Sequence, residues 1–118
     1  MVKVVESLAK LAVKAAEEKK AERVVVMDIS HLTPIADYFI ICNGNNERQV
    51  QAIVTEIREQ AHKAGYEVKG IEGAEEGRWV LVDLGDVVVH VFHREERDFY
   101  NIERLWSDAN IVAFSEQG

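Results

Sequence analysis

One segment of the chain, Trp79–Phe92 (WVLVDLGDVVVHVF), has the pattern of a β-hairpin with a tight turn at its centre. Gly85 and Asp86 suit the central positions of that turn, because glycine tolerates the positive φ angle that tight hairpin turns require. Side chains alternate between the two faces of a strand, so the turn fixes both the register and the residues that share a face. The segment therefore predicts two paired strands whose side chains can be assigned to faces.

The two faces of this predicted hairpin differ in chemistry. One face is entirely aliphatic and must be covered by the core: it carries Val80, Val82, Leu84, Val87, Val89 and Val91. The other, mixed face carries Trp79, Leu81, Asp83, Val88, His90 and Phe92. Either helices cover the mixed face as well, or another protein docks on it. Asp83 and His90 favour docking, because in a core each would need a buried hydrogen-bond partner.

Length and composition predict a single domain over residues 1–118 with an acidic balance. The net charge of −7 opposes approach to a phosphate backbone and favours basic partners. The single cysteine, Cys42, cannot form an intrachain disulfide, and we expect it to be a buried small hydrophobe. No apolar run is long enough to span a membrane. We therefore expect a cytoplasmic protein without membrane contact.

The remaining segments predict a mixed α/β fold. Helical periodicity predicts two amphipathic helices, at residues 4–21 and 46–64. Short β-branched runs predict three further strands, at residues 23–29, 37–42 and 66–71. Asn46 and Gln49 predict a capping box, and Gly65 a helix end. With a short helix in the tail, at residues 94–106, the order is αββαβββα: a mixed sheet of about five strands flanked by helices, with a βαβ crossover.

The sequence holds no recognisable set of catalytic residues or metal ligands. No Asp-x-Asp pair occurs, so metal-dependent nucleotidyl transfer lacks its usual carboxylates. Asp83 precedes the predicted turn and Asp86 lies within it, which favours a turn-stabilising role. His90 and His93 point to opposite faces of a strand, and the other histidines have no paired ligand. We therefore expect a protein that is not an enzyme and binds no metal or cofactor.

In this order and spacing, the motifs of the chain resemble the ribosomal silencing factor family, also called Iojap-like proteins, over nearly its whole length. The resemblance rests on Asp37–Cys42, Asn43-Gly44-Asn45, Arg48–Val50, Glu72-Gly73, Gly77, Trp79–Leu81, Asp83, Gly85–Phe92, Arg97, Tyr100, Leu105-Trp106 and Asp108-Ala109. The family usually has Ser-Gly with a further Ser where this chain has Asn43–Asn46. Asparagine caps and turns as serine does, so we expect the same fold there without a hydroxyl.

The resemblance implies a nucleotidyltransferase-like fold and a function on the ribosome. Members of this family bind large-subunit ribosomal protein fourteen and sterically block joining of the small subunit, which lowers translation when nutrients are scarce. Organellar relatives are tied to assembly of the large subunit. We therefore expect a translational repressor that binds the large ribosomal subunit. A role in large-subunit assembly remains open as the alternative, and metal-dependent nucleotidyl transfer is a more distant one.

The mixed face of the hairpin is the expected contact surface. Ribosomal proteins are basic, so an acidic protein with aromatic rings at the centre of its interface suits one of them. The expected contacts are Trp79, Leu81, Asp83, Val88, His90 and Phe92, with Asp37 and Tyr100 at the rim. Four arginines either add a peripheral contact to ribosomal RNA or neutralise neighbouring carboxylates: Arg78, Arg94, Arg97 and Arg104. Exposed aromatic residues also suit a homodimer of the free protein.

Overall fold

The computed structural model describes residues 2–112 as ten elements packed into two layers of helices around one sheet. In chain order these are α1 (Val2–Glu18), β1 (Glu22–Asp28), β2 (Tyr38–Gly44), α2 (Glu47–Lys63), β3 (Gly70–Glu72), β4 (Trp79–Asp83), β5 (Val87–His93), α3 (Arg94–Tyr100), α4 (Ile102–Leu105) and β6 (Asn110–Val112). The predicted order αββαβββα is confirmed up to its last helix. The tail then adds a second short helix and a strand.

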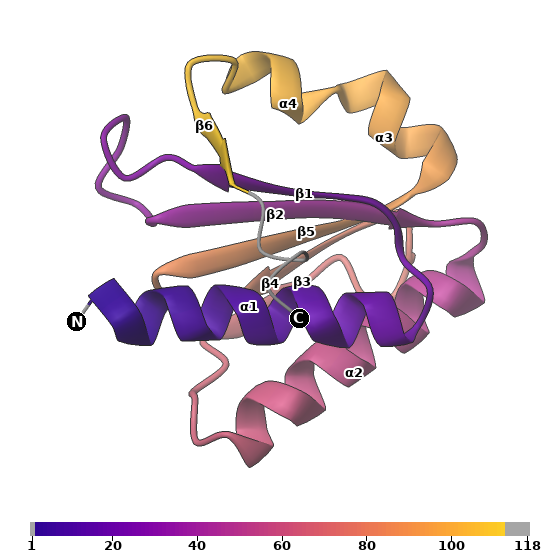
Figure 1. The fold of residues 1–118 in the computed structure, drawn as a ribbon. Helices are drawn as coiled ribbons and strands as arrows, with labels where there is room; N and C mark the ends of the chain where they lie inside the picture. Colours follow the sequence, from indigo (N-terminus) through magenta and orange to yellow (C-terminus); the bar gives the residue numbers. More distant parts are fainter. Residues whose placement is uncertain (1, 113–118) are drawn as a thin grey trace.

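The sheet is mixed, as predicted, and has six strands in the order β3-β4-β5-β2-β1-β6 (Figure 1). Among the described strands, only β2 and β5 are parallel neighbours, and every other pair is antiparallel. The chain leaves β2, passes through α2 and the β3–β4 pair, and returns beside β2 as β5. The crossover therefore joins β2 to β5, whereas β3 lies at the edge of the sheet.

The hairpin forms with the predicted register. Trp79 pairs with Phe92, Leu81 with His90 and Asp83 with Val88. Gly85 adopts a φ angle of +94°, and the N–H of Leu84 donates to the carbonyl oxygen of Val87 at 2.9 Å across the turn. The tight turn therefore determines which side chains share a face, as the sequence indicates.

Helices cover the two faces of the sheet to different extents. Helices α1 and α2 lie together across one face, and α3 and α4 cross the other (Figure 1). The aliphatic face of the hairpin packs under α1 and α2, with Val80, Val82 and Val89 fully buried. The mixed face belongs to a second core cluster with Met27 and Phe39. Since α3 and α4 are short, this second face is only partly covered.

The start of α2 is capped in the way that the sequence predicts. The side chain of Asn46 accepts a hydrogen bond from the N–H of Gln49 at 2.8 Å. The side chain of Gln49 returns to accept from the N–H of Asn45 at 2.8 Å, one residue earlier than in the usual capping box. Gly65 follows the helix with a φ angle of +87°, which confirms its role in ending α2.

Two segments differ from the sequence prediction. The strand expected at 66–71 is reduced to Gly70–Glu72, because Tyr66 and Val68 pack against the core outside any strand. The single tail helix is split at Asn101, whose left-handed φ of 46° ends α3 and begins α4. Within the part of the chain that the structure describes, no helix is long and apolar enough to cross a membrane.

Candidate protein-docking surface

The mixed face of the hairpin divides into a partly exposed half on β4 and a buried half on β5. Trp79 and Leu81 on β4 keep part of their surface exposed. The side chains of Val88, His90 and Phe92 on β5 are buried, Phe92 with 0% of its surface exposed. Val88, His90 and Phe92, which were expected among the contacts, therefore lie beneath the surface rather than on it. The cause is the tail: β5 lies in the interior of the sheet and runs directly into α3, which folds back over it.

The aromatic rings of this face contact one another in a continuous series. Trp79 stacks on Phe92, with ring centroids 5.1 Å apart, and packs against Tyr100 of α3 at 4.6 Å. His90 meets Phe39 edge-on at 4.7 Å, and Phe39 in turn meets Trp106, the residue that follows α4, at 5.2 Å. Contacts of this kind fix ring orientation as well as burying area. Trp79 is therefore held in place by its neighbours while part of its surface stays exposed.

A hydrogen bond from Trp79 sets the chemistry of His90. The indole Nε1–H donates to His90 Nδ1 at 3.2 Å. Burial lowers the pKa of His90 to about 4, so the ring is neutral at neutral pH. Because Nδ1 accepts, the single proton sits on Nε2, which has no hydrogen-bond partner among the described residues. His90 therefore has a hydrogen-bond partner within the chain, the indole of Trp79 on the same face.

The two carboxylates predicted for this surface have different positions. Asp83 is half-buried at the end of β4, and its Oδ1 accepts from the N–H of Gly85 at 2.9 Å, which confirms the turn-stabilising role. Asp37 lies just before β2, where its N–H donates to the carbonyl oxygen of Asp86 at 2.8 Å. Asp83 therefore lies beside the exposed half of the face, and Asp37 lies near the hairpin turn, at the far end of the strands from Trp79.

The tail helices add exposed apolar side chains that were not among the expected contacts. Phe99 on α3 and Leu105 on α4 are 79% and 77% exposed. The Phe99 ring meets Tyr100 edge-on at 5.0 Å, so it extends the row that begins at Trp79. One signal in the sequence was available: two adjacent aromatics in a short helix point about 100° apart, so both cannot face the sheet. We call Trp79, Leu81, Phe99 and Tyr100 the docking surface.

Two arginines near the tail, Arg78 and Arg97, form ion pairs with carboxylates, and Arg97 also donates to a backbone carbonyl oxygen. Arg78 pairs with Glu95 at 3.1 Å and with Glu96 at 2.6 Å. Arg97 is 1% exposed and makes a two-pronged contact to Glu103, at 3.2 and 3.1 Å. Arg94 and Arg104 are exposed. A basic rim made of all four arginines is therefore wrong, since Arg97 lies inside the molecule.

The cysteine thiol and possible metal ligands are the other reactive groups of the described residues. Burial raises the pKa of the Cys42 thiol to about 12, so the cysteine is a buried hydrophobe, as predicted. Over residues 2–112, no group of three or more histidine, cysteine, aspartate or glutamate side chains is placed to hold a metal ion. What the described face presents is apolar and aromatic contact area.

Comparison with known proteins places this geometry in a family. The family model described as "Ribosomal silencing factor during starvation" matches residues 3–117. Ribosomal silencing factor RsfS of Bacillus subtilis is 54% identical over 106 residues, which cover 90% of each chain. A solved structure from Bacillus halodurans superposes with a TM-score of 0.83 at 50% identity, covering 92% of this chain and 99% of the other.

A plant relative extends the comparison. The chloroplastic protein Iojap of Zea mays is 34% identical over 99 residues, which cover 84% of this chain and 43% of the plant protein. The match to the family model spans both the hairpin and the tail helices that build the docking surface. The chain belongs to the ribosomal silencing factor family.

Proposed function

We propose that this protein represses translation by binding the large ribosomal subunit through its docking surface and blocking the small subunit from joining. The observation that carries the proposal is a row of partly exposed aromatic side chains on an acidic member of the ribosomal silencing factor family. Apolar patches of this kind on a folded domain are typical of protein interfaces. The proposed partner is large-subunit ribosomal protein fourteen.

Charge around the docking surface supports a basic partner. Glu72 on β3 is exposed and pairs directly with Leu81, so its carboxylate borders the apolar row on the same face. Asp83, the last residue of β4, is a second carboxylate on this face. Aromatic anchors in the centre with carboxylates at the rim complement a basic ribosomal protein, because the rings supply contact area and the charges orient the approach.

The proposed mechanism is steric and involves no bond chemistry. The folded chain measures 35 × 33 × 28 Å, so a single bound copy covers a substantial part of any surface on which it docks. Direct contacts come from Trp79, Leu81 and Tyr100, while Phe92 and His90 support them from below. Repression then follows occupancy of the large subunit, and the protein needs no cofactor for it.

Replacing the central anchor tests the proposal. Trp79→Ala removes the ring that contacts Tyr100, Phe92 and His90, and we expect the Kd for purified large ribosomal subunits to rise about 30-fold or more, as for a typical aromatic anchor. Inhibition of subunit joining should weaken in parallel. The matched control is Tyr66→Ala, which removes a half-buried ring on the α1 and α2 side of the sheet.

Two results would contradict the proposal. One is Trp79→Ala binding to the large subunit with the affinity of the unmodified protein. The other is inhibition of subunit joining that persists in a variant unable to bind.

Excess isolated ribosomal protein fourteen should relieve inhibition, because it competes for the docking surface. If the isolated protein does not compete, the partner assignment is wrong even where binding to the subunit holds.

A further inference from the structure

The two tail helices are too short to hold their positions by themselves. Helix α3 has seven residues and α4 has four, well below the length at which a helix is stable alone in water. Tyr100 and Phe99, which form half of the docking surface, both lie on α3. The orientation of the docking surface therefore depends on contacts that fasten these helices to the sheet.

Arg97 makes the most extensive of these contacts. Its Nη1 donates to the carbonyl oxygen of Arg23 on β1 at 2.6 Å and to Oδ1 of Asn43 on β2 at 3.0 Å. Its Nε and Nη2 both donate to the carboxylate of Glu103 on α4. One guanidinium thus joins α3, α4, β1 and β2, and its charge is balanced inside the molecule.

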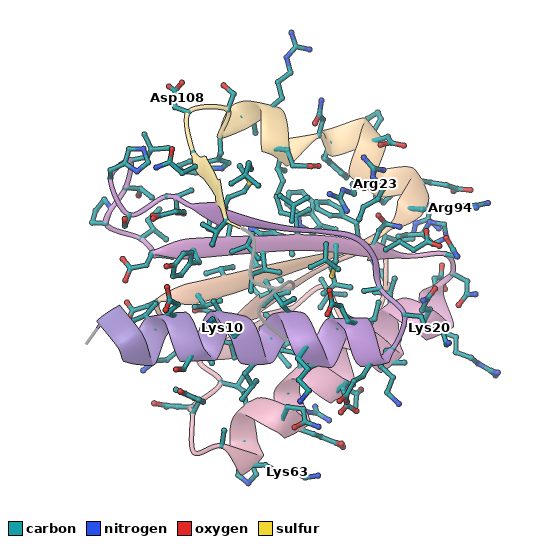
Figure 2. All side chains as sticks on the ribbon, viewed as in Figure 1. Lys10, Lys20, Arg23, Lys63, Arg94 and Asp108 are labelled. Carbon is teal, nitrogen blue, oxygen red and sulfur yellow. The ribbon has the colours of Figure 1, made fainter. Side chains whose placement is uncertain are left out.

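The local backbone is shaped to receive this side chain. The pairing of β1 with β2 shifts register between Glu22 and Val25, and Arg23 within this irregularity has a positive φ of 53°. A positive φ is costly for a residue with a side chain. The Arg23 side chain lies beside α3 (Figure 2), where its guanidinium pairs with Asp98 at 3.1 Å. The irregular part of β1 therefore contacts α3 through both its backbone and its side chain.

Geometry links Arg97 to the docking surface. Arg97 and Tyr100 are three residues apart, so they lie on the same side of α3, one toward the sheet interior and the other against Trp79. The contact between Arg97 and Glu103 also spans the left-handed residue Asn101, which separates α3 from α4. Fixing this contact fixes the angle between the two helices.

We propose that Arg97 is a positioning residue that preorganises the docking surface for its partner, an inference that rests on the proposed function. With Arg97 in place, Tyr100 and Phe99 are held beside Trp79 before binding occurs. Without it, α3 and α4 sample other orientations, and the apparent affinity falls with the fraction of molecules that are competent to bind. Arg97 itself is buried and touches no partner.

Arg97→Lys is the primary test variant. A lysine keeps the positive charge but cannot contact Glu103, Asn43 and the Arg23 carbonyl together, because it lacks the guanidinium fork. We expect the Kd for purified large ribosomal subunits to rise about tenfold or more, at a temperature where circular dichroism shows the variant fully folded. Arg58→Lys, an exposed position on α2, is the matched control and should bind as the unmodified protein does.

A ¹⁹F NMR experiment tests the positioning role of Arg97 in the protein alone, without ribosomes. The chain has two tryptophans, so fluorotryptophan labelling gives two ¹⁹F signals, which Trp106→Phe assigns. In Arg97→Lys we expect the Trp79 signal to shift or broaden, because Tyr100 no longer packs on it in one orientation. Glu103→Gln should cause a smaller change of the same kind. The double variant should resemble Arg97→Lys alone, since both residues act through one contact.

The outcomes separate this inference from the proposed function. If the unmodified protein binds the large subunit, but Arg97→Lys binds equally well with an unchanged Trp79 signal, the positioning role is overturned. If the unmodified protein does not bind, the proposed function fails, and the Trp79 signal alone decides the positioning role. Strictly additive effects of Arg97→Lys and Glu103→Gln on the binding free energy would also overturn it.

Discussion

His90 carries a pH dependence that its burial imposes. The pKa of its imidazole is lowered from the usual 6.5 to about 4 by desolvation. The unfolded chain therefore takes up a proton at a higher pH than the folded chain. Stability attributable to His90 is complete above about pH 6.5 and is lost as the pH falls toward 4, below which both states are protonated and no further loss occurs.

Replacing His90 by a residue that does not titrate should make the free energy of unfolding depend less on pH below pH 7. His90→Gln keeps an acceptor for the Trp79 indole but cannot take up a proton in this range. We expect the loss of unfolding free energy between pH 7 and pH 4.5 to be smaller in the variant by about 2 kcal/mol, measured by urea denaturation at each pH. His62→Gln, at an exposed position on α2, should leave the loss unchanged. An identical profile for His90→Gln and the unmodified protein would contradict the assigned pKa.

The cap of α2 is the clearest case in which local sequence determines an element. Asn46→Ala removes the acceptor for the Gln49 N–H, and we expect the free energy of unfolding to fall by about 1 kcal/mol. The midpoint of urea denaturation should decrease while the slope stays constant. Thr55→Ala, exposed in the middle of α2, is the control and should be neutral or slightly stabilising. A loss as large in Thr55→Ala would mean that the cap is not the cause.

Elements defined by local chemistry could be predicted, and elements defined by distant contacts could not. The Gly85 turn fixes the register of β4 and β5, so the face of every side chain in the hairpin followed from the sequence. Strand β6 has three residues and exists only because it pairs with β1, more than eighty residues away in the chain. No local pattern at Asn110–Val112 distinguishes such a strand from a loop.

The same reasoning explains which part of the docking surface could be predicted. Trp79 and Leu81 followed from the alternation of side chains along β4. The burial of Phe92 depends on where α3 lies, and that depends on Arg97, whose contacts reach residues far away in the sequence. The exposure of Phe99 and Leu105 depends on the same placement. The sequence pattern therefore gave the residues that share the mixed face, but not the helices that cover it.

The net charge of −7 affects how the protein approaches its proposed partner more than how it folds. A basic ribosomal protein attracts an acidic chain, whereas the RNA around it on the intact subunit repels that chain. The exposed carboxylate of Glu72 beside Leu81 is placed to attract a basic partner during this approach. Encounter should therefore be governed by charge, and the lifetime of the complex by the apolar docking surface.

Salt should thus act in different ways on the isolated partner and on the intact subunit. Raising salt from about 50 to about 300 mM shortens the screening length, so the association rate with isolated ribosomal protein fourteen should fall. The association rate with the intact subunit should fall less or even rise, because salt also weakens the repulsion between the acidic chain and the RNA. Stopped-flow kinetics measures both rates. Glu72→Gln should lower the association rate with the isolated protein at low salt, while Glu59→Gln on α2 should not. An equal and steep fall for both partners would mean that contacts to RNA phosphates, rather than the acidic rim of the docking surface, drive encounter.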